Sequence, residues 1–222
     1  SSDLHDVRLA AERDDLLFNR LYLEPLFNGR YPEQLQARVG LAPTVVRDGD
    51  LAEIATPMDY LGMNYYFRQL ASGVHAQRFE VPLPPGAIVT EMGWEVSHDG
   101  LTEHLVDMKR RYANLPPVYI TESGCACDDR VVEGRVDDHF RVAYLRQQIA
   151  AIGRAIHAGV DMRGYFVWSL MDNFEWAFGY ERRFGLVHVD YATQQRTPKA
   201  SAQWYRHFIA QQRALSEGTP GL

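Results

Sequence analysis

A carboxylate follows directly after a predicted buried strand. Residues 118–121, entered through two prolines, are rich in the β-branched and aromatic types that form such strands. Glu122 comes next, and Gly124 then allows the backbone to turn sharply. In a parallel α/β sheet the side chains at the carboxyl ends of strands reach ligands, so Glu122 is a candidate catalytic residue. The same motif also fits an acidic residue that only opens a loop.

Two further stretches place polar and aromatic side chains after predicted strands. Residues 59–66 predict a strand that delivers Asn64 and Tyr66 to one end. Residues 164–168 predict another buried strand, and residues 169–176 behind it are dense in aromatic and acidic types. Each stretch also has a structural explanation, because Asn64 is a turn-forming type and a strand-end aromatic such as Tyr66 commonly packs in a core.

Helices are predicted between and around these strands. The first begins near Asp3 and is ended by Pro25, and others cover residues 32–39, 101–112, 137–157 and 199–215. The apolar positions at helical spacing are Val7, Ala11, Phe18 and Leu21 in the first helix, and Phe140, Tyr144, Ile149, Ile152 and Ile156 in the helix over 137–157.

The remaining segments are predicted as loops and a hairpin. The proline-rich run 81–86 excludes a helix or a central strand. A hairpin is predicted within residues 183–190, and the tail over 217–222 is expected to fray.

Strands alternate with helices, and the candidate chemistry lies at the strands' carboxyl ends, which is typical of an α/β fold. Three parallel strands alone make an awkward sheet, because they leave two bare edges. A (β/α)₈ barrel, or TIM barrel, needs eight strands over about 250 residues. This chain has only three convincing barrel strands.

Composition excludes several classes of function. The 222 residues are 46% hydrophobic and 23% charged, as in ordinary globular proteins, and the net charge of −6 offers no basic surface for nucleic acid or membrane. No apolar run approaches the roughly 20 residues of a membrane span, and no signal-peptide pattern opens the chain. Because Ser1 is not preceded by Met, we expect further sequence upstream.

The two cysteines of the chain indicate a reducing compartment. Cys125 and Cys127 are two positions apart, which makes a poor disulfide pair and only half of a zinc ligand set. We therefore predict free thiols and a cytoplasmic location, with metal binding as the less favoured alternative.

Taken together, the motifs resemble a known family. Residues 62–66 (Gly-Met-Asn-Tyr-Tyr), 119–124 (Tyr-Ile-Thr-Glu-Ser-Gly) and 168–176 (Trp-Ser-Leu-Met-Asp-Asn-Phe-Glu-Trp) resemble, in order and spacing, the C-terminal part of family 1 glycoside hydrolases. Residues 19–32, 92–101 and 183–191 fit the same family, so the resemblance covers nearly the whole chain. It implies a retaining β-glucosidase fold in which residues 1–222 form the C-terminal part of a single (β/α)₈ barrel domain, about strands six to eight.

The resemblance also implies that the chain lacks half of the active site. The family's acid/base glutamate lies in a Thr-Phe-Asn-Glu-Pro run, which has no match in this sequence. The N-terminal portion of the barrel, from the same gene product or a second chain, would have to supply it and close the barrel.

Within the family pattern, Glu122 corresponds to the nucleophile and Tyr66 to the tyrosine whose hydroxyl touches it. Retaining cleavage uses two carboxyl groups only about 5–5.5 Å apart, one attacking the anomeric carbon and one protonating the leaving oxygen. Ser123 departs from the pattern, since the family usually has Asn there, and the smaller side chain could alter the pocket rim.

The resemblance assigns sugar recognition to six residues. Glu175 and Trp176 correspond to residues that bind the hydroxyls of the non-reducing sugar, with Glu175 directed at positions 4 and 6. Trp168 corresponds to the platform under the ring, Phe184 to a lining residue, Trp94 to the aglycone side, and Asn64 to a position near the sugar. Core packing is the alternative for the aromatics, and for Trp94 a buried anchor of the following helix.

Glu175 favours an unphosphorylated substrate. A 6-phosphosugar would place a dianion where this carboxylate points, and like charges about 4 Å apart repel by several kcal/mol near a protein surface. Lys199 and Arg182 do not form a phosphate clamp. The predicted substrates are therefore β-glucosides or cello-oligosaccharides, with β-galactosides and β-fucosides also open, and no cofactor or metal is needed. The histidines, His98, His104, His139 and His188, show no ligand spacing.

Two functions from different classes follow from these observations. The chain is either the nucleophile-bearing part of a retaining β-glucosidase or a remnant that binds sugar or a partner protein without catalysis. Having both Glu122 and Glu175 favours the enzyme, because a binding remnant need not keep a nucleophile.

Overall fold

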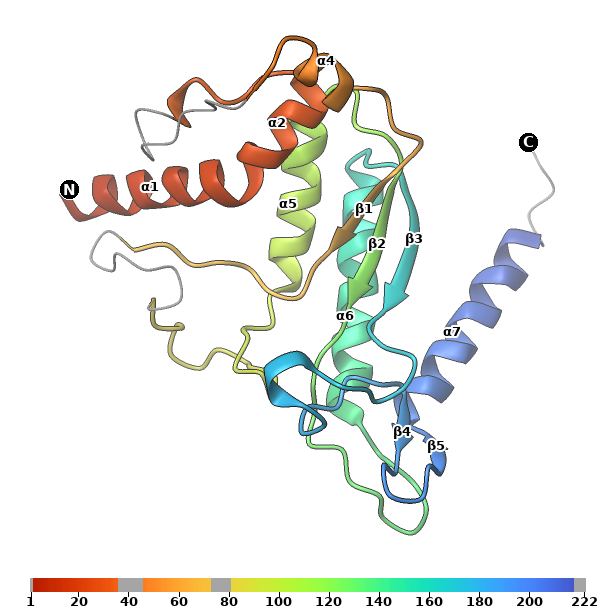
Figure 1. The fold of residues 1–222 in the computed structure, drawn as a ribbon. Helices are drawn as coiled ribbons and strands as arrows, with labels where there is room; N and C mark the ends of the chain where they lie inside the picture. Colours follow the sequence, from red (N-terminus) through yellow and green to blue (C-terminus); the bar gives the residue numbers. More distant parts are fainter. Residues whose placement is uncertain (1, 36–45, 73–80, 218–222) are drawn as a thin grey trace.

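The computed structural model describes residues 2–35, 46–72 and 81–217, and a parallel sheet lies at its centre (Figure 1). The sheet has the order β1-β2-β3, with β1 (Leu61–Asn64), β2 (Val118–Ser123) and β3 (Met162–Val167). These are the three strands that the sequence predicts. Both pairs, β1 with β2 and β2 with β3, are parallel.

Two helices cover one face of the sheet. α5 (His98–Arg111) connects β1 to β2, and α6 (His139–His157) connects β2 to β3. The fully buried residues of this core are Leu101, Leu105, Val118, Ile120, Ala151 and Ala155. On the other face, Gly62, Asn64, Thr121 and Phe166 are exposed, so no element of the described chain covers it.

The N-terminal helix continues past the residue predicted to end it. α1 (Ser2–Asp15) passes through a π-helical segment, η1 (Leu16–Arg20), into α2 (Leu21–Asn28). Pro25 is buried inside α2, which contradicts the prediction. Pro25 is the fifth of the eight residues of α2, and the helix continues for only three residues beyond it. The helix ends at Gly29, which has a φ of 61° and donates its N–H to the Pro25 carbonyl at 3.2 Å.

The predicted apolar side of this helix is only partly buried. Val7, Ala11 and Phe18 are exposed, which contradicts the amphipathic prediction for these positions, and Leu21 is half-buried. Phe27 is buried instead, with its ring centroid 4.9 Å from that of Tyr112 at the end of α5.

The apolar stripe predicted for α6 is buried only in part: Tyr144 and Ile152 are buried as predicted, but the two ends of the stripe are not. Phe140 and Ile156 are 40% and 51% exposed, whereas Arg141 and Gln148 are buried. Periodicity fails here because the two polar residues have polar partners inside the protein. Gln148 donates to the hydroxyls of Ser123 and Tyr144 at 3.2 and 3.1 Å.

The C-terminal segment contains a hairpin that the sequence placed too early. β4 (Val187–Val189) lies in the expected stretch, but it pairs antiparallel with β5 (Arg196–Pro198) further along the chain. The chain turns between Asp190 and Gln195, where Asp190 Oδ1 accepts hydrogen bonds from two backbone N–H groups. α7 (Ala200–Glu217) follows, close to the predicted helix.

In the described chain, short helices also lie before β1 and after β3. α4 (Asp50–Ile54) precedes β1, and a turn of 3₁₀ helix, η3 (Trp176–Phe178), lies after β3. The run 81–86 is neither helix nor strand, as predicted. Of the helix predicted over 32–39, Gln34 and Leu35 are helical and residues 36–39 lie outside the described residues, as do residues 218–222 of the tail. None of the described helices combines the length and apolar character needed to cross a membrane.

Candidate active site

Glu122 lies at the carboxyl end of β2, as predicted, and Tyr66 reaches it from the chain after β1. The register pairs Asn64 with Glu122, and the Tyr65 N–H donates to the Glu122 carbonyl at 2.9 Å. This alignment brings the next side chain into contact, and the Tyr66 hydroxyl donates to Glu122 Oε2 at 2.8 Å. The two residues are 56 positions apart in the sequence, so only the strand pairing joins them.

The Tyr66 hydroxyl keeps its proton. Burial raises its pKa well above the ordinary value, and the hydrogen bond to Glu122 and the charges of Glu122 and Glu175 raise it further. The hydroxyl is therefore the donor and the carboxylate the acceptor. The charge of Glu175 is therefore within electrostatic range of the hydroxyl that contacts Glu122.

Glu175 is held in the loop after β3. Its N–H donates to the Gly179 carbonyl at 2.6 Å, and its carbonyl accepts from the Phe178 N–H at 2.8 Å. The side chain is half-buried and has no hydrogen-bond partner among the described residues. A ligand hydroxyl could therefore donate to this carboxylate.

Three aromatic rings stand together beside the carboxylates. The Tyr66 ring lies 5.5 Å from that of Trp94 and 6.2 Å from that of Phe184, between centroids, and Trp94 and Phe184 are also 6.2 Å apart. Phe184 is buried and Trp94 half-buried. The structure thus brings together Glu122, Tyr66, Trp94 and Phe184 from four separate stretches.

The two tryptophans of the stretch 168–176 differ in burial. The Trp168 N–H donates to the Ser123 carbonyl at 3.0 Å, which sets Trp168 beside the residue that follows Glu122. Its side chain is half-buried, and its peptide bond to Ser169 is cis. Trp176 is 83% exposed with a φ of 39°, so core packing does not explain it.

Asn64 lies next to Glu122 across the strands but on the open face of the sheet. It is exposed, and its Oδ1 accepts from the Thr121 hydroxyl at 2.8 Å. Ser123 instead points into the core, with its hydroxyl oxygen 3.3 Å from that of Tyr144 and fully buried. The expectation that Ser123 alters a pocket rim is therefore wrong, because its side chain contacts α6.

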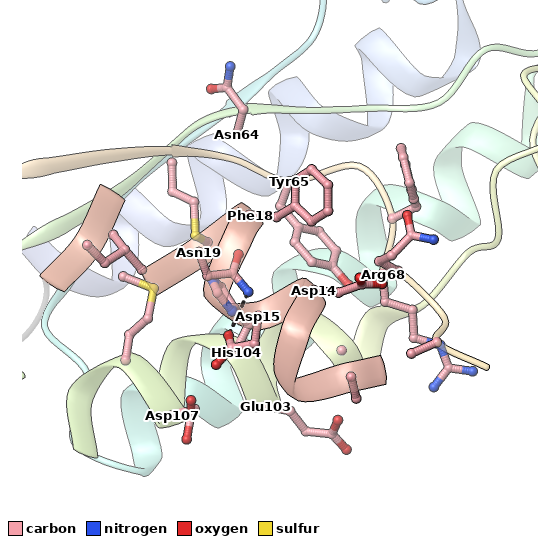
Figure 2. Close-up of a pocket in the computed structure, with 18 of the residues that line it drawn as sticks. Asp14, Asp15, Phe18, Asn19, Asn64, Tyr65, Arg68, Glu103, His104 and Asp107 are labelled. Atoms are coloured by element: carbon pink, nitrogen blue, oxygen red, sulfur yellow. Dashed lines mark hydrogen bonds between the residues drawn. The ribbon is translucent and has the colours of Figure 1, made fainter. Parts of the chain in front are cut away.

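A cavity of about 670 Å³ lies away from this group, between the N-terminal helix, β1 and α5 (Figure 2). Figure 2 shows acidic side chains, among them Asp14, Asp15 and Glu103, together with His104, while Asn64 points away from them. Glu122, Tyr66 and Glu175 do not line it. The cavity follows the outer edge of β1, where the sheet has no further strand in the described chain.

A group of buried ion pairs, which the sequence patterns do not predict, connects the segments after β2 and β3. Lys199 is fully buried, and its Nζ lies 2.5 Å from Asp129 Oδ2 and 2.7 Å from Asp172 Oδ1. Arg183 lies 2.6 Å from Asp172, and Arg141 pairs with Asp129 at 2.7 Å and with Asp138. Burial alone would raise the pKa of Asp172, but Lys199 and Arg183 bring it below its usual value. The signal in the sequence was the single Asp inside the aromatic run 168–176.

The two cysteines contact each other, and His98 contacts a glutamine of α6. Cys125 and Cys127 are free thiols, as predicted, with their sulfurs 3.8 Å apart. His98 Nδ1 lies 2.9 Å from Gln148 Oε1. In the described ranges, no three His, Cys, Asp or Glu side chains are grouped to hold a metal ion.

Comparisons with known proteins agree with the predicted resemblance. A family model described as glycosyl hydrolase family 1 matches residues 1–214. A bifunctional beta-D-glucosidase/beta-D-fucosidase of Bifidobacterium breve is 45% identical, over 90% of this chain and 48% of that protein. A 6-phospho-beta-galactosidase of Streptococcus equi subsp. zooepidemicus is 34% identical, over 91% of this chain and 49% of that protein.

Solved structures show the same relationship. The crystal structure of the psychrophilic beta-glucosidase BglU from Micrococcus antarcticus matches with a TM-score of 0.83 and 44% identity, over 90% of this chain and 48% of that one. The chain spans about half the length of the curated relatives it matches. The fold prediction is confirmed: the chain is α/β and corresponds to part of a (β/α)₈ barrel, and its described residues do not close a barrel.

Proposed function

The chain belongs to glycosyl hydrolase family 1, and on that premise we propose that it is the nucleophile-bearing part of a retaining β-glucosidase. Residues 1–222 would form the C-terminal part of one barrel domain, and the remaining barrel portion would supply the acid/base glutamate. The contact between Tyr66 and Glu122, made at the carboxyl ends of neighbouring strands, is the observation that carries the proposal.

The proposed reaction is a double displacement. Glu122 Oε1, which has no hydrogen-bond partner among the described residues, attacks the anomeric carbon while the acid/base residue protonates the leaving oxygen. A glycosyl ester of Glu122 and the free alcohol result. Water, deprotonated by the same acid/base residue, then attacks the anomeric carbon, releasing the sugar with its original configuration and the free carboxylate.

The proposed sugar site combines hydrogen-bonding and apolar groups. Glu175 and Trp176 would bind hydroxyls of the non-reducing sugar, and Trp168 would stack against its ring. Phe184 would line the site, Trp94 would contact the aglycone and Asn64 would lie near the sugar. The electrostatic effect of Glu175 on the pKa of the Tyr66 hydroxyl supports the first of these roles, because it requires the Glu175 carboxylate to lie in the neighbourhood of that hydroxyl.

Removing the Tyr66 hydroxyl should impair the reaction without unfolding the protein. In the assembled enzyme, meaning this chain with the remaining barrel portion, Tyr66→Phe should lower kcat/KM about 10- to 100-fold, because a charge-assisted hydrogen bond to the nucleophile is lost. Tyr65→Phe is the matched control, since Tyr65 donates to the Ser97 carbonyl and not to Glu122. Equal kcat/KM values for the two variants would contradict the role of Tyr66.

Glu175 should make the enzyme prefer unphosphorylated sugars. Lys199, the nearest lysine in the sequence, is fully buried and neutralised by Asp129 and Asp172, so it does not offset the repulsion between Glu175 and a phosphate. We expect kcat/KM for an aryl β-glucoside to exceed that for its 6-phosphate at least about 100-fold. Because one relative is named a 6-phospho-beta-galactosidase, a preference for phosphorylated sugars is the competing outcome. Activity confined to phosphorylated substrates would overturn the proposal that the substrate is unphosphorylated.

The experiment that separates an enzyme from a binding remnant is covalent trapping. An activated 2-deoxy-2-fluoro-β-glucoside should add one glycosyl mass to the assembled enzyme, and peptide mapping should locate it on Glu122. Sugar binding without any label, in a sample that contains both barrel portions, would favour the remnant.

The proposed partner is the complementary barrel portion. The open edge of β1 beside the 670 Å³ cavity is where the next parallel strand would lie. No nucleic acid or membrane partner is proposed, and the cytoplasmic location suggested by the two thiols stays a prediction.

A further inference from the structure

Six charged side chains form a connected group under the candidate site. We call Asp129, Asp138, Arg141, Asp172, Arg183 and Lys199 the buried ion cluster. Its three acids balance its three bases, and five of the side chains are at most 1% exposed, while Arg183 is 21% exposed. Buried charges are retained only when each one is paired, so the geometry of the cluster is tightly constrained.

Asp172 holds both ends of the loop that contains Glu175. It lies three residues before Glu175, and its Oδ1 accepts the Gly185 N–H at 3.0 Å from the far end of the loop. Its Oδ2 accepts Arg183 Nη1 at 2.6 Å and the Val189 N–H at 3.3 Å. Residues 173–184 therefore form a loop whose base is closed by one carboxylate.

The cluster also connects this loop to the chain that follows Glu122. Lys199 bridges Asp172 to Asp129, which lies seven residues after Glu122. Arg141 donates to Asp129 and also to the carbonyls of Cys125 and Arg183, at 3.3 and 2.8 Å. The segments that carry Glu122 and Glu175 thus share one set of ion pairs.

We propose that Asp172 is a positioning residue that sets the carboxylate of Glu175 against the sugar site. This inference rests on the proposed function, because it assigns Glu175 to the substrate. Every partner of the Asp172 carboxylate is a donor, which makes its full charge and both of its oxygens necessary. An Asn of the same shape would turn an N–H₂ group toward donors on one side, and the base of the loop would shift.

The test is a double-mutant cycle in the assembled enzyme. Asp172→Asn should lower kcat/KM for an aryl β-glucoside about 100-fold, the loss expected from a misplacement of about 1 Å. It should also reduce the preference for this substrate over the 6-deoxy analogue, as Glu175→Gln is expected to do. The double variant should lose no more than Glu175→Gln alone, within about twofold, because both changes remove the same contact.

Asp138→Asn is the matched control. Asp138 belongs to the same cluster and is equally buried, but among the described residues its carboxylate contacts only Arg141 and Ser201, whose N–H it accepts at 2.8 Å, and no residue of the loop 173–184. It should lower the free energy of unfolding, leave the preference over the 6-deoxy analogue unchanged, and combine additively with Glu175→Gln. Should Asp172→Asn not fold, Arg183→Met removes one partner of Asp172 at a partly exposed position and enters the same cycle.

The outcomes separate this inference from the proposed function. If Glu175→Gln weakens hydrolysis and Asp172→Asn adds to it independently, the positioning role is overturned and the proposed function stands. If Glu175→Gln changes neither kcat/KM nor the preference over the 6-deoxy analogue, the role of Glu175 falls and the positioning role falls with it.

Discussion

Glu122→Gly should lower hydrolysis of an aryl β-glucoside by the assembled enzyme about 10⁴-fold or more. The carboxylate supplies the attacking oxygen, and without it the first displacement has no internal nucleophile. Added azide should restore cleavage of a substrate with a good leaving group, because the shortened side chain leaves room for a small anion. The product should be the α-glycosyl azide, since a single displacement inverts the anomeric centre. Rates and the product configuration, from NMR, are the two measurements.

Glu133→Gly is the control for this experiment. Glu133 has an exposed side chain and a φ of 50°, which glycine accommodates, so this change should leave kcat unaffected. Two results would mean that another group is the nucleophile. One is that Glu122→Gly forms no α-glycosyl azide when azide is added, and the other is that this variant hydrolyses the substrate at a near-normal rate.

Gly124→Ala should destabilise the protein by about 3 kcal/mol or more. An added Cβ would lie 1.9 Å from the Trp168 carbonyl oxygen and 3.0 Å from its carbonyl carbon, and both atoms belong to the backbone. That backbone cannot move aside cheaply, because the Trp168 N–H is bonded to the Ser123 carbonyl at 3.0 Å. Overpacking against flexible side chains costs about 1–3 kcal/mol, and here no side chain can yield.

Gly153→Ala is the matched control, and it should stabilise the protein instead of destabilising it. Gly153 is exposed within α6, and nothing lies within 4 Å of its added Cβ. Alanine there should raise the free energy of unfolding by about 0.5–1 kcal/mol, because glycine is the poorer helix former. Denaturant unfolding of both variants tests the pair. A Gly124→Ala variant as stable as the parent would show that β2 and β3 separate more readily at this point than their hydrogen bond indicates.

The sequence predicts the strands of this chain well because each strand is a local pattern. Residues 118–120 and 162–167 alternate or cluster apolar types over a few positions, and that is enough to predict extended strands. Val118 and Ile120 of β2 are buried as predicted, but β3, predicted as a buried strand, has no buried residue, because one face of the sheet is uncovered in the described chain. Glu122 was found for the same reason, since its place depends on where one strand ends. The family resemblance supplied Tyr66, whose contact with Glu122 depends on the register between two strands.

What the sequence could not predict depends on partners that are distant in the chain. Arg141 interrupts the apolar stripe of α6, and periodicity assigns it to solvent, yet it is fully buried against Asp129 and Asp138. Lys199 is paired with two aspartates that lie 70 and 27 positions away. A charged residue is buried only when every partner is in place, and no local window contains them all.

The sheet's parallel order limits how the rest of the barrel can be connected to this chain. Antiparallel neighbours can be joined by a two-residue turn, whereas a parallel neighbour needs a crossover of a dozen or more residues. A strand that continues the parallel order beside β1 or β3 must therefore enter from the end opposite Glu122. The 60 residues that precede β1, which include α1, α2 and α4, already exceed that length, so genetic fusion of an upstream barrel portion to this chain would need only a short linker.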